Sequence, residues 1–164
     1  MPDLWQFIDE IDADKQAMAV KRLEDRAQIP KFAAIRENYF DKIGLPLSGR
    51  ILELGCGTGA VCRAIASRPG FVGTVVGSDL SAKLIEVAKD ITANLGLKNI
   101  EYFRADGQGS TAHHGQFDLV LAHTVISVLQ AELDHWIEAI DRALSENTFF
   151  ASCNYVTYGM VKAS

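Results

Sequence analysis

The sequence predicts an α/β fold with a doubly wound, mostly parallel sheet. Two observations support this prediction. Short runs of apolar and β-branched residues alternate with longer stretches of helical spacing, and a glycine cluster separates the first run from the next helical stretch. Parallel strands joined by helices need right-handed crossovers, which place helices on both faces of the sheet. Ligands of such sheets bind beyond the carboxyl ends of the strands.

The first 44 residues are predicted to form a helical segment. Residues 10–43 repeat apolar side chains at helical spacing, and Pro30 interrupts the pattern and starts it again, so two helices are expected. Trp5, Phe7 and Ile8 form an apolar cluster ahead of them, which either packs against the sheet or folds over the ligand as a lid. We therefore divide the single domain into this helical segment, 1–44, which is the candidate lid, and a core, 45–164.

The core is predicted to alternate strands and helices. The strands are short runs rich in apolar and β-branched residues, bounded by glycine, proline and asparagine. They are expected at 50–54, 74–79, 100–104, 117–122 and 148–155. Ser81 is a typical helix cap, and Pro69-Gly70 and Gly96 are typical helix ends. The helices are expected at 60–67, 82–95 and 131–143.

The composition excludes several classes of partner and site. The 164 residues carry 16 Lys and Arg against 21 Asp and Glu, so a basic surface for nucleic acid is not expected. The most apolar stretch, 117–129, is too short and too polar for a membrane span. Three cysteines without paired spacing predict no metal site and no disulfide framework, and they fit the reducing, cytoplasmic compartment.

The strongest functional signal is the segment 53–59, which reads ELGCGTG between a strand and a helix. Glycines there permit a tight turn and let a ligand approach the main chain closely. Gly55, Gly57 and Ala60 also match the pattern of dinucleotide-binding loops, in which a pyrophosphate rests on the helix N-terminus. The loop alone therefore leaves the identity of the nucleotide open.

Two carboxylates near the loop narrow the choice. Glu53 ends the first strand, where its charge would repel a pyrophosphate and could hold an ammonium group. Asp79 ends the second strand, at about the spacing of ~20 residues that places an acid on ribose hydroxyls. A cationic ligand that contains adenosine is favoured.

Four segments in order, 51–59, 76–81, 103–107 and 117–120, resemble the successive motifs of class I S-adenosylmethionine-dependent methyltransferases. The resemblance covers about residues 45–155 and is strongest to the small-molecule branch, which includes quinone-biosynthesis and sterol-type enzymes. It implies a Rossmann-like sheet with strand order 3-2-1-4-5. It also implies S-adenosyl-L-methionine as the cofactor, S-adenosyl-L-homocysteine as the product, and a small-molecule acceptor.

The resemblance also implies a cofactor site. The glycine loop would line the methionine part and the ribose, Asp79 would take both ribose hydroxyls, and Leu80 would pack on the adenine. Asp106 would accept a hydrogen bond from the adenine amino group, and His123 stands where the family often offers a backbone carbonyl to the methionine ammonium. The residues so assigned are Glu53, Gly55, Cys56, Gly57, Thr58, Gly59, Asp79, Leu80, Asp106, Gly107, Gln108 and His123.

Methyl transfer is an in-line displacement, for which alignment of donor and acceptor can supply most of the acceleration. An obligatory catalytic residue is not required. If the acceptor needs a base, His123 is the best-placed histidine because it follows a strand end. Cys56 lacks an evident partner for nucleophilic catalysis and is interpreted as a small space-filling residue.

The C-terminal part departs from the family pattern. Members have the strand order 3-2-1-4-5-7-6, whereas only nine residues, 156–164, follow the fifth predicted strand. Strands 6 and 7 are therefore expected to be missing, and the fifth strand is expected to form a sheet edge that pairs in a homodimer or is covered by the returning chain. Three functions stay open: a small-molecule methyltransferase, a truncated S-adenosylmethionine-binding protein without activity, and a nicotinamide-dependent oxidoreductase.

Overall fold

A computed structural model of the chain describes residues 8–105, 116–123, 149–152 and 157–159. Within these residues, six strands form one sheet in the order β3-β2-β1-β4-β5-β6. The strands are β1 (Arg50–Leu54), β2 (Thr74–Asp79), β3 (Ile100–Arg104), β4 (Leu119–His123), β5 (Phe149–Ser152) and β6 (Thr157–Gly159). All neighbouring pairs are parallel except β5 with β6. The predicted mostly parallel sheet and its order 3-2-1-4-5 are confirmed.

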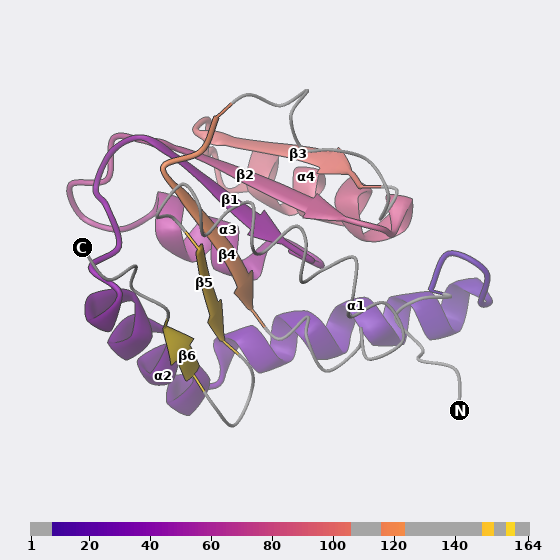
Figure 1. The fold of residues 1–164 in the computed structure, drawn as a ribbon. Helices are drawn as coiled ribbons and strands as arrows, with labels where there is room; N and C mark the ends of the chain where they lie inside the picture. Colours follow the sequence, from indigo (N-terminus) through magenta and orange to yellow (C-terminus); the bar gives the residue numbers. More distant parts are fainter. Residues whose placement is uncertain (1–7, 106–115, 124–148, 153–156, 160–164) are drawn as a thin grey trace.

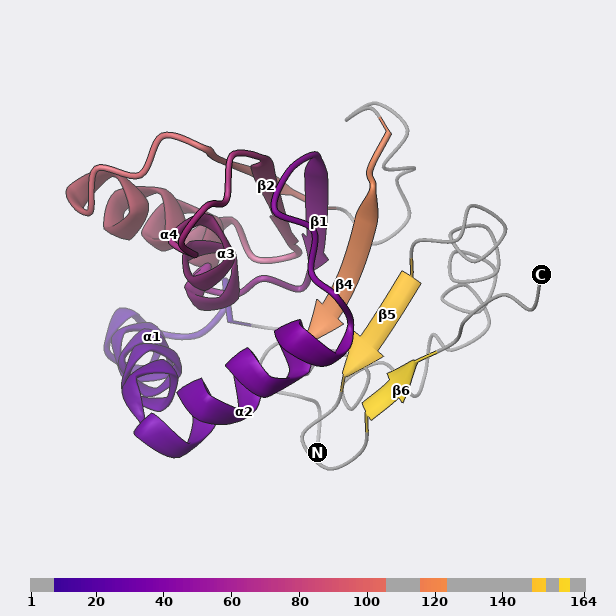
Figure 2. The same ribbon diagram turned by 90° about the vertical axis from the view of Figure 1, so that its left-hand side faces the viewer.

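The described part of the chain has four helices, which lie on one face of this sheet (Figures 1 and 2). They are α1 (Ala13–Gln28), α2 (Pro30–Lys42), α3 (Ala60–Ala66) and α4 (Ala82–Asn94). Three of them begin where the sequence supplies a start signal: Asp12 and Ser81 cap α1 and α4, and Pro30 occupies the first turn of α2. The two N-terminal helices predicted around Pro30 are confirmed. The helix predicted at 131–143 lies outside the described residues.

The main apolar core lies between the sheet and the helices α2 and α3. Phe40 of α2, Ile65 of α3, Ile51 of β1 and Leu121 of β4 are fully buried there. A smaller cluster joins Ile8 and α1 to α4 through Ala19 and Leu84. Complete burial of such side chains contributes about 1.5–3 kcal/mol each, so this packing fixes how the strand ends are placed.

The far edge of the sheet differs from the sequence-based expectation. The chain returns after β5, and β6 pairs antiparallel with it through Phe150 with Gly159 and Ser152 with Thr157. The expected absence of a strand after β5 is therefore wrong, and the alternative that the returning chain covers this edge is confirmed. The described part of β5 is four residues long and that of β6 three; the remainder of the strand predicted at 148–155 lies outside the described residues. The homodimer stays a prediction. The unpaired edge of β5, which was the reason for expecting it, is occupied by β6.

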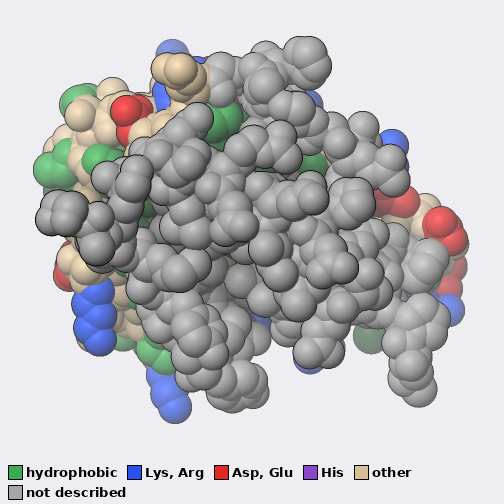
Figure 3. Space-filling view, viewed as in Figure 1, with side chains coloured by type: hydrophobic (Ala, Val, Ile, Leu, Met, Phe, Trp, Pro, Cys, Tyr) green, Lys and Arg blue, Asp and Glu red, His purple; other side chains and the backbone are tan. Residues whose placement is uncertain are grey.

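The described surface is mixed in charge. Lys and Arg side chains and Asp and Glu side chains both appear around the rim of the face shown in Figure 3. Among the described residues, no helix is both long and apolar enough to cross a membrane.

Deletion of residues 157–164 removes β6 and should make the protein self-associate. The backbone groups of β5 that face β6 would then lack partners, and an unpaired strand edge is a template for pairing with another chain. Light scattering across a dilution series should show concentration-dependent association of this variant. Deletion of 160–164 alone, which keeps β6, is the control and should behave like the full chain. Equal behaviour of the two deletions would contradict the prediction.

Candidate functional site

The glycine loop between β1 and α3 depends on three left-handed backbone positions. Gly55, Gly57 and Gly59 have φ angles of +63°, +54° and +79°. Side chains disfavour this conformation, which glycine adopts without steric cost. A Cβ on Gly59 would also collide with the hydroxyl of Tyr102 on β3. The sequence pattern of alternating glycines therefore reflects the backbone shape of this loop.

Asp79 joins the glycine loop to the end of the neighbouring strand. One carboxylate oxygen, Oδ2, accepts the amide N–H of Gly57 at 2.8 Å, and the other, Oδ1, accepts that of Ser81 at 3.0 Å. The amide of Cys56 donates to the carbonyl of Ser78 at 2.8 Å. A carboxylate has about four acceptor positions, so each oxygen of Asp79 keeps capacity for a ligand hydroxyl.

Burial raises the pKa of Asp79 above its usual value of 3.8, because a buried carboxylate loses hydration. The amide donors of Ser81 and Gly57 oppose this shift, since they stabilise the ionised form. The nearby carboxylate of Asp9 adds to the shift by repulsion. Hydroxyl donors or a cation from a ligand would compensate for the hydration that the ionised form has lost.

Glu53 lies deeper than the sequence suggested. Its side chain is only 2% exposed, and its Oε2 accepts a hydrogen bond from Cys62 Sγ of α3 at 2.9 Å. Burial raises the pKa of Glu53 to about 8, so this carboxyl is mostly neutral at pH 7. The repulsion of a pyrophosphate, expected from the sequence, is weakened accordingly. Its predicted hold on an ammonium group stays a prediction.

The two described thiols near the loop are buried and free. A hydrogen bond with Cys62 lowers the pKa of Cys56, but burial and the carboxyls of Glu53 and Asp79 together raise it by more. Burial raises the pKa of Cys62 well above its usual value. Thiols rather than thiolates dominate at neutral pH, which favours the space-filling interpretation of Cys56. No cluster of His, Cys, Asp or Glu among the described residues could hold a metal ion.

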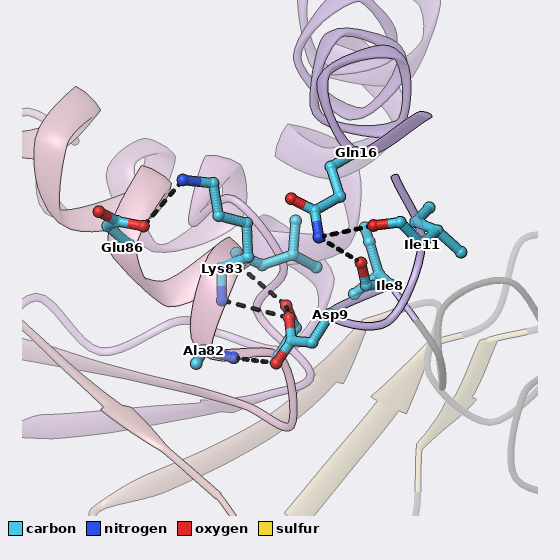
Figure 4. Close-up of polar contacts among 9 residues, drawn as sticks. Ile8, Asp9, Ile11, Gln16, Ala82, Lys83 and Glu86 are labelled. Atoms are coloured by element: carbon cyan, nitrogen blue, oxygen red, sulfur yellow. Dashed lines mark hydrogen bonds and ion pairs between the residues drawn. The ribbon is translucent and has the colours of Figure 1, made fainter. Parts of the chain in front are cut away.

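The N-terminal segment reaches the turn after Asp79, which sequence reasoning missed (Figure 4). The carboxylate of Asp9 accepts the Ser81 hydroxyl, the Ala82 amide at 2.9 Å and the Lys83 amide at 3.3 Å. The Gln16 side chain donates to two carbonyls beside Asp9 and holds this approach in place. Asp9 and Ser81 are 72 positions apart, so no local pattern could have linked them.

A second contact from the N-terminal segment was also missed. Arg63 of α3 donates to the Thr58 carbonyl of the glycine loop and forms an ion pair with Glu24 of α1 at 2.7 Å. Arginine and glutamate are common in amphipathic helices. Their presence in α1 and α3 therefore does not indicate a contact with the glycine loop.

The other predicted residues are only partly placed. Leu80 follows Asp79 and is 40% exposed. His123 is the last residue of β4, which pairs with β1, and its backbone therefore lies at the same edge of the sheet as the glycine loop. Its side chain lies outside the described part of the structure, as do Asp106, Gly107 and Gln108.

Comparisons with known proteins agree with this geometry. A family model described as "Methyltransferase domain" matches residues 51–147. The biotin biosynthesis bifunctional protein BioCD of Bordetella avium is 37% identical over 111 residues, which are 66% of this chain and 22% of that protein. A ubiquinone biosynthesis O-methyltransferase of Chelativorans is 37% identical over 116 residues, 66% of this chain and 44% of that enzyme. The chain thus spans less than half the length of these relatives.

Solved structures show the same fold. A SAM-dependent methyltransferase from Aquifex aeolicus aligns with a TM-score of 0.62 at 20% identity, over 87% of this chain and 70% of that one. Coclaurine N-methyltransferase, bound to N-methylheliamine and SAH, aligns with a TM-score of 0.61 at 19% identity, over 73% of this chain and 34% of that one.

Replacement of Glu53 by glutamine should flatten the pH dependence of stability. The pKa of Glu53 is raised from 4.5 to about 8 by folding, so the folded state binds more protons than the unfolded state between these values. The free energy of unfolding of the wild type should fall as pH rises through this window, by up to about 1.4 kcal/mol per pH unit. Glutamine cannot ionise, so Glu53→Gln should lose this slope.

Urea unfolding at a series of pH values measures this difference. Glu86→Gln is the control, because Glu86 is an exposed glutamate whose pKa is lowered by Lys83. Parallel pH curves for the wild type and Glu53→Gln would show that burial does not hold the Glu53 carboxyl in its neutral form.

Proposed function

Because this chain belongs to the methyltransferase-domain family of class I methyltransferases, we propose that it binds S-adenosyl-L-methionine and transfers the methyl group to a small molecule. One observation carries the proposal. The Asp79 carboxylate lies at the end of β2, hydrogen-bonded to the glycine loop at the end of β1, with acceptor capacity left on both oxygens. Paired ribose hydroxyls are the donors that such a carboxylate suits.

The neighbouring residues fit the remaining parts of this cofactor. The exposed Leu80 is adjacent to Asp79 and offers an apolar surface for the adenine. The glycine loop lets the methionine part approach the backbone without interference from a Cβ. Burial leaves the Asp79 carboxylate short of hydration, so hydroxyl donors or positive charge on a ligand would stabilise its ionised form. Asp106, Gly107, Gln108 and the His123 carbonyl complete the proposed site.

The chemistry proposed is an in-line displacement at carbon. The sulfonium supplies the leaving group: the methyl carbon bonds to the acceptor as its bond to sulfur breaks, and sulfur keeps the electron pair. This chain's residues then have to bind and align rather than to react. The buried, protonated thiols of Cys56 and Cys62 fit that division of roles, because neither is poised as a nucleophile.

The names of the relatives support a small-molecule acceptor. They include ubiquinone biosynthesis O-methyltransferases, an aklanonic acid methyltransferase of Streptomyces that is 33% identical over 98 residues, and a nocamycin O-methyltransferase. The absence of a nucleic-acid partner, the homodimer, the cytoplasmic location and the role of 1–44 as a lid stay predictions.

Calorimetric titration of the full chain should show binding of S-adenosylmethionine and S-adenosylhomocysteine but not of NAD. Asp79→Ala should weaken binding at least about tenfold, because it removes the two charge-assisted hydrogen bonds proposed between this carboxylate and the ribose hydroxyls. It also removes the hydrogen bond that holds the Gly57 amide. Asp118→Ala is a matched control, since Asp118 accepts the Arg50 amide at the opposite end of β1. Unchanged affinity in Asp79→Ala, with the fold intact, would contradict the ribose assignment.

Replacement of His123 by alanine should leave measurable methyl transfer. If alignment supplies most of the acceleration, the rate should fall by less than the 10²–10⁴-fold typical of removing a general base. Transfer of a labelled methyl group to a panel of hydroxylated and amino aromatic compounds would identify an acceptor and measure this rate. A complete loss of transfer with cofactor affinity intact would show that the imidazole is required.

A further inference from the structure

We propose that Glu24 and Arg63 are positioning residues for the glycine loop, and that they couple the docking of α1 to cofactor binding. This inference rests on the proposed function. Neither residue is expected to touch the cofactor. They act through the carbonyl of Thr58, which lies in the middle of the loop.

Arg63 is a nearly buried cation with two separate acceptors. Its side chain is 9% exposed, and Nη2 donates to both carboxylate oxygens of Glu24, at 2.9 and 2.7 Å. The other arm, Nη1, donates to the Thr58 carbonyl. A buried guanidinium is costly unless it is paired, so removal of the Glu24 charge alters how Arg63 is held. The planar fork of arginine allows one side chain to bridge a helix and a loop.

The glycine loop needs such a hold. Thr58 is buried between two left-handed glycines, Gly57 and Gly59, and glycines leave a backbone with many alternative conformations. Asp79 restrains the loop from the side of β2, through the amide of Gly57. Arg63 restrains it from the side of α1 and α3, through the carbonyl of the next residue. The two restraints together hold the amide of Gly57 and the carbonyl of Thr58.

A second residue of α1 also lies near the loop. A Cβ built on Gly57 would lie 3.4 Å from Cδ1 of Leu23, the residue before Glu24. The Leu23 side chain therefore lies close to Gly57, and Glu24 reaches the next loop residue, Thr58, through Arg63. Ligand binding that orders the loop should stabilise the docked α1, and loss of the ion pair should weaken binding by the same coupling.

The alternative is that the ion pair only fastens α1 to the core. The chain contains a matched control for this alternative. Arg68, just after α3, pairs with Glu37 of α2 at 2.8 Å and with Asp41 at 2.9 Å, so it also fastens an N-terminal helix. No hydrogen bond or ion pair described for Arg68 or Glu37 involves residues 55–59. Glu37→Gln should therefore weaken a helix attachment without releasing the loop.

The test compares Glu24→Gln, Arg63→Lys and Glu37→Gln in the full chain. Calorimetry measures S-adenosylhomocysteine affinity, hydrogen exchange follows the amides of 13–28 and 56–59, and thermal unfolding confirms the fold. We expect Glu24→Gln and Arg63→Lys to bind at least about fivefold more weakly than the wild type and to exchange faster at 56–59. Glu37→Gln should do neither. In the wild type, ligand should slow exchange in 13–28.

Each outcome has a distinct meaning. If the wild type binds S-adenosylhomocysteine, and Glu24→Gln and Glu37→Gln bind it with equal affinity, the positioning role is overturned and the proposed function stands. Faster exchange in 13–28 alone, with 56–59 unchanged, also overturns the positioning role, because that is the pattern of a simple fastening. If the wild type binds neither S-adenosylhomocysteine nor S-adenosylmethionine, the proposed function fails, and the inference that rests on it fails too.

Discussion

The hydrogen bond from the Gly57 amide to the Asp79 carboxylate is the interaction on which the site depends. It connects the turns after β1 and β2, two neighbouring strands of the sheet. The parallel register brings these ends together, since Leu54 pairs with Ser78. The carboxylate then turns a flexible glycine loop into a defined one. Asp79 thus has a structural role in the free protein and a proposed binding role with the cofactor.

Much of this arrangement could be predicted from the sequence because its causes are local. Alternating glycines after a short apolar strand specify a tight strand-to-helix turn. Because neighbouring strands are parallel, an acid at the end of the next strand lies beside that turn. Ser81 and Pro30 start helices by local rules that hold in most contexts. The strand order 3-2-1-4-5 came from the family resemblance, and the sheet confirms it.

The contacts that could not be predicted are those between distant parts of the chain. Asp9 reaches the first turn of α4, and Glu24 reaches Arg63 across 39 positions. An acidic residue in an exposed helix looks the same in a sequence whether or not it meets a partner. The burial of Glu53 is another example: its position at the end of a strand was correct, but its neutral state depends on burial in the surrounding core, which outweighs the opposing effect of the hydrogen bond from Cys62. The strand β6 was missed because three residues carry too little pattern to be recognised.

The contacts of Asp9 also constrain the order in which the chain can fold. Helices such as α1 form from neighbouring residues within microseconds, whereas closure of a long loop has to precede a distant contact. The turn that receives Asp9 lies 72 positions later, beyond β1, α3 and β2. During synthesis, α1 therefore leaves the ribosome well before its docking surface exists. Its apolar face has to wait until α4 has been made, so α1 reaches its native place later than its early position in the chain would suggest.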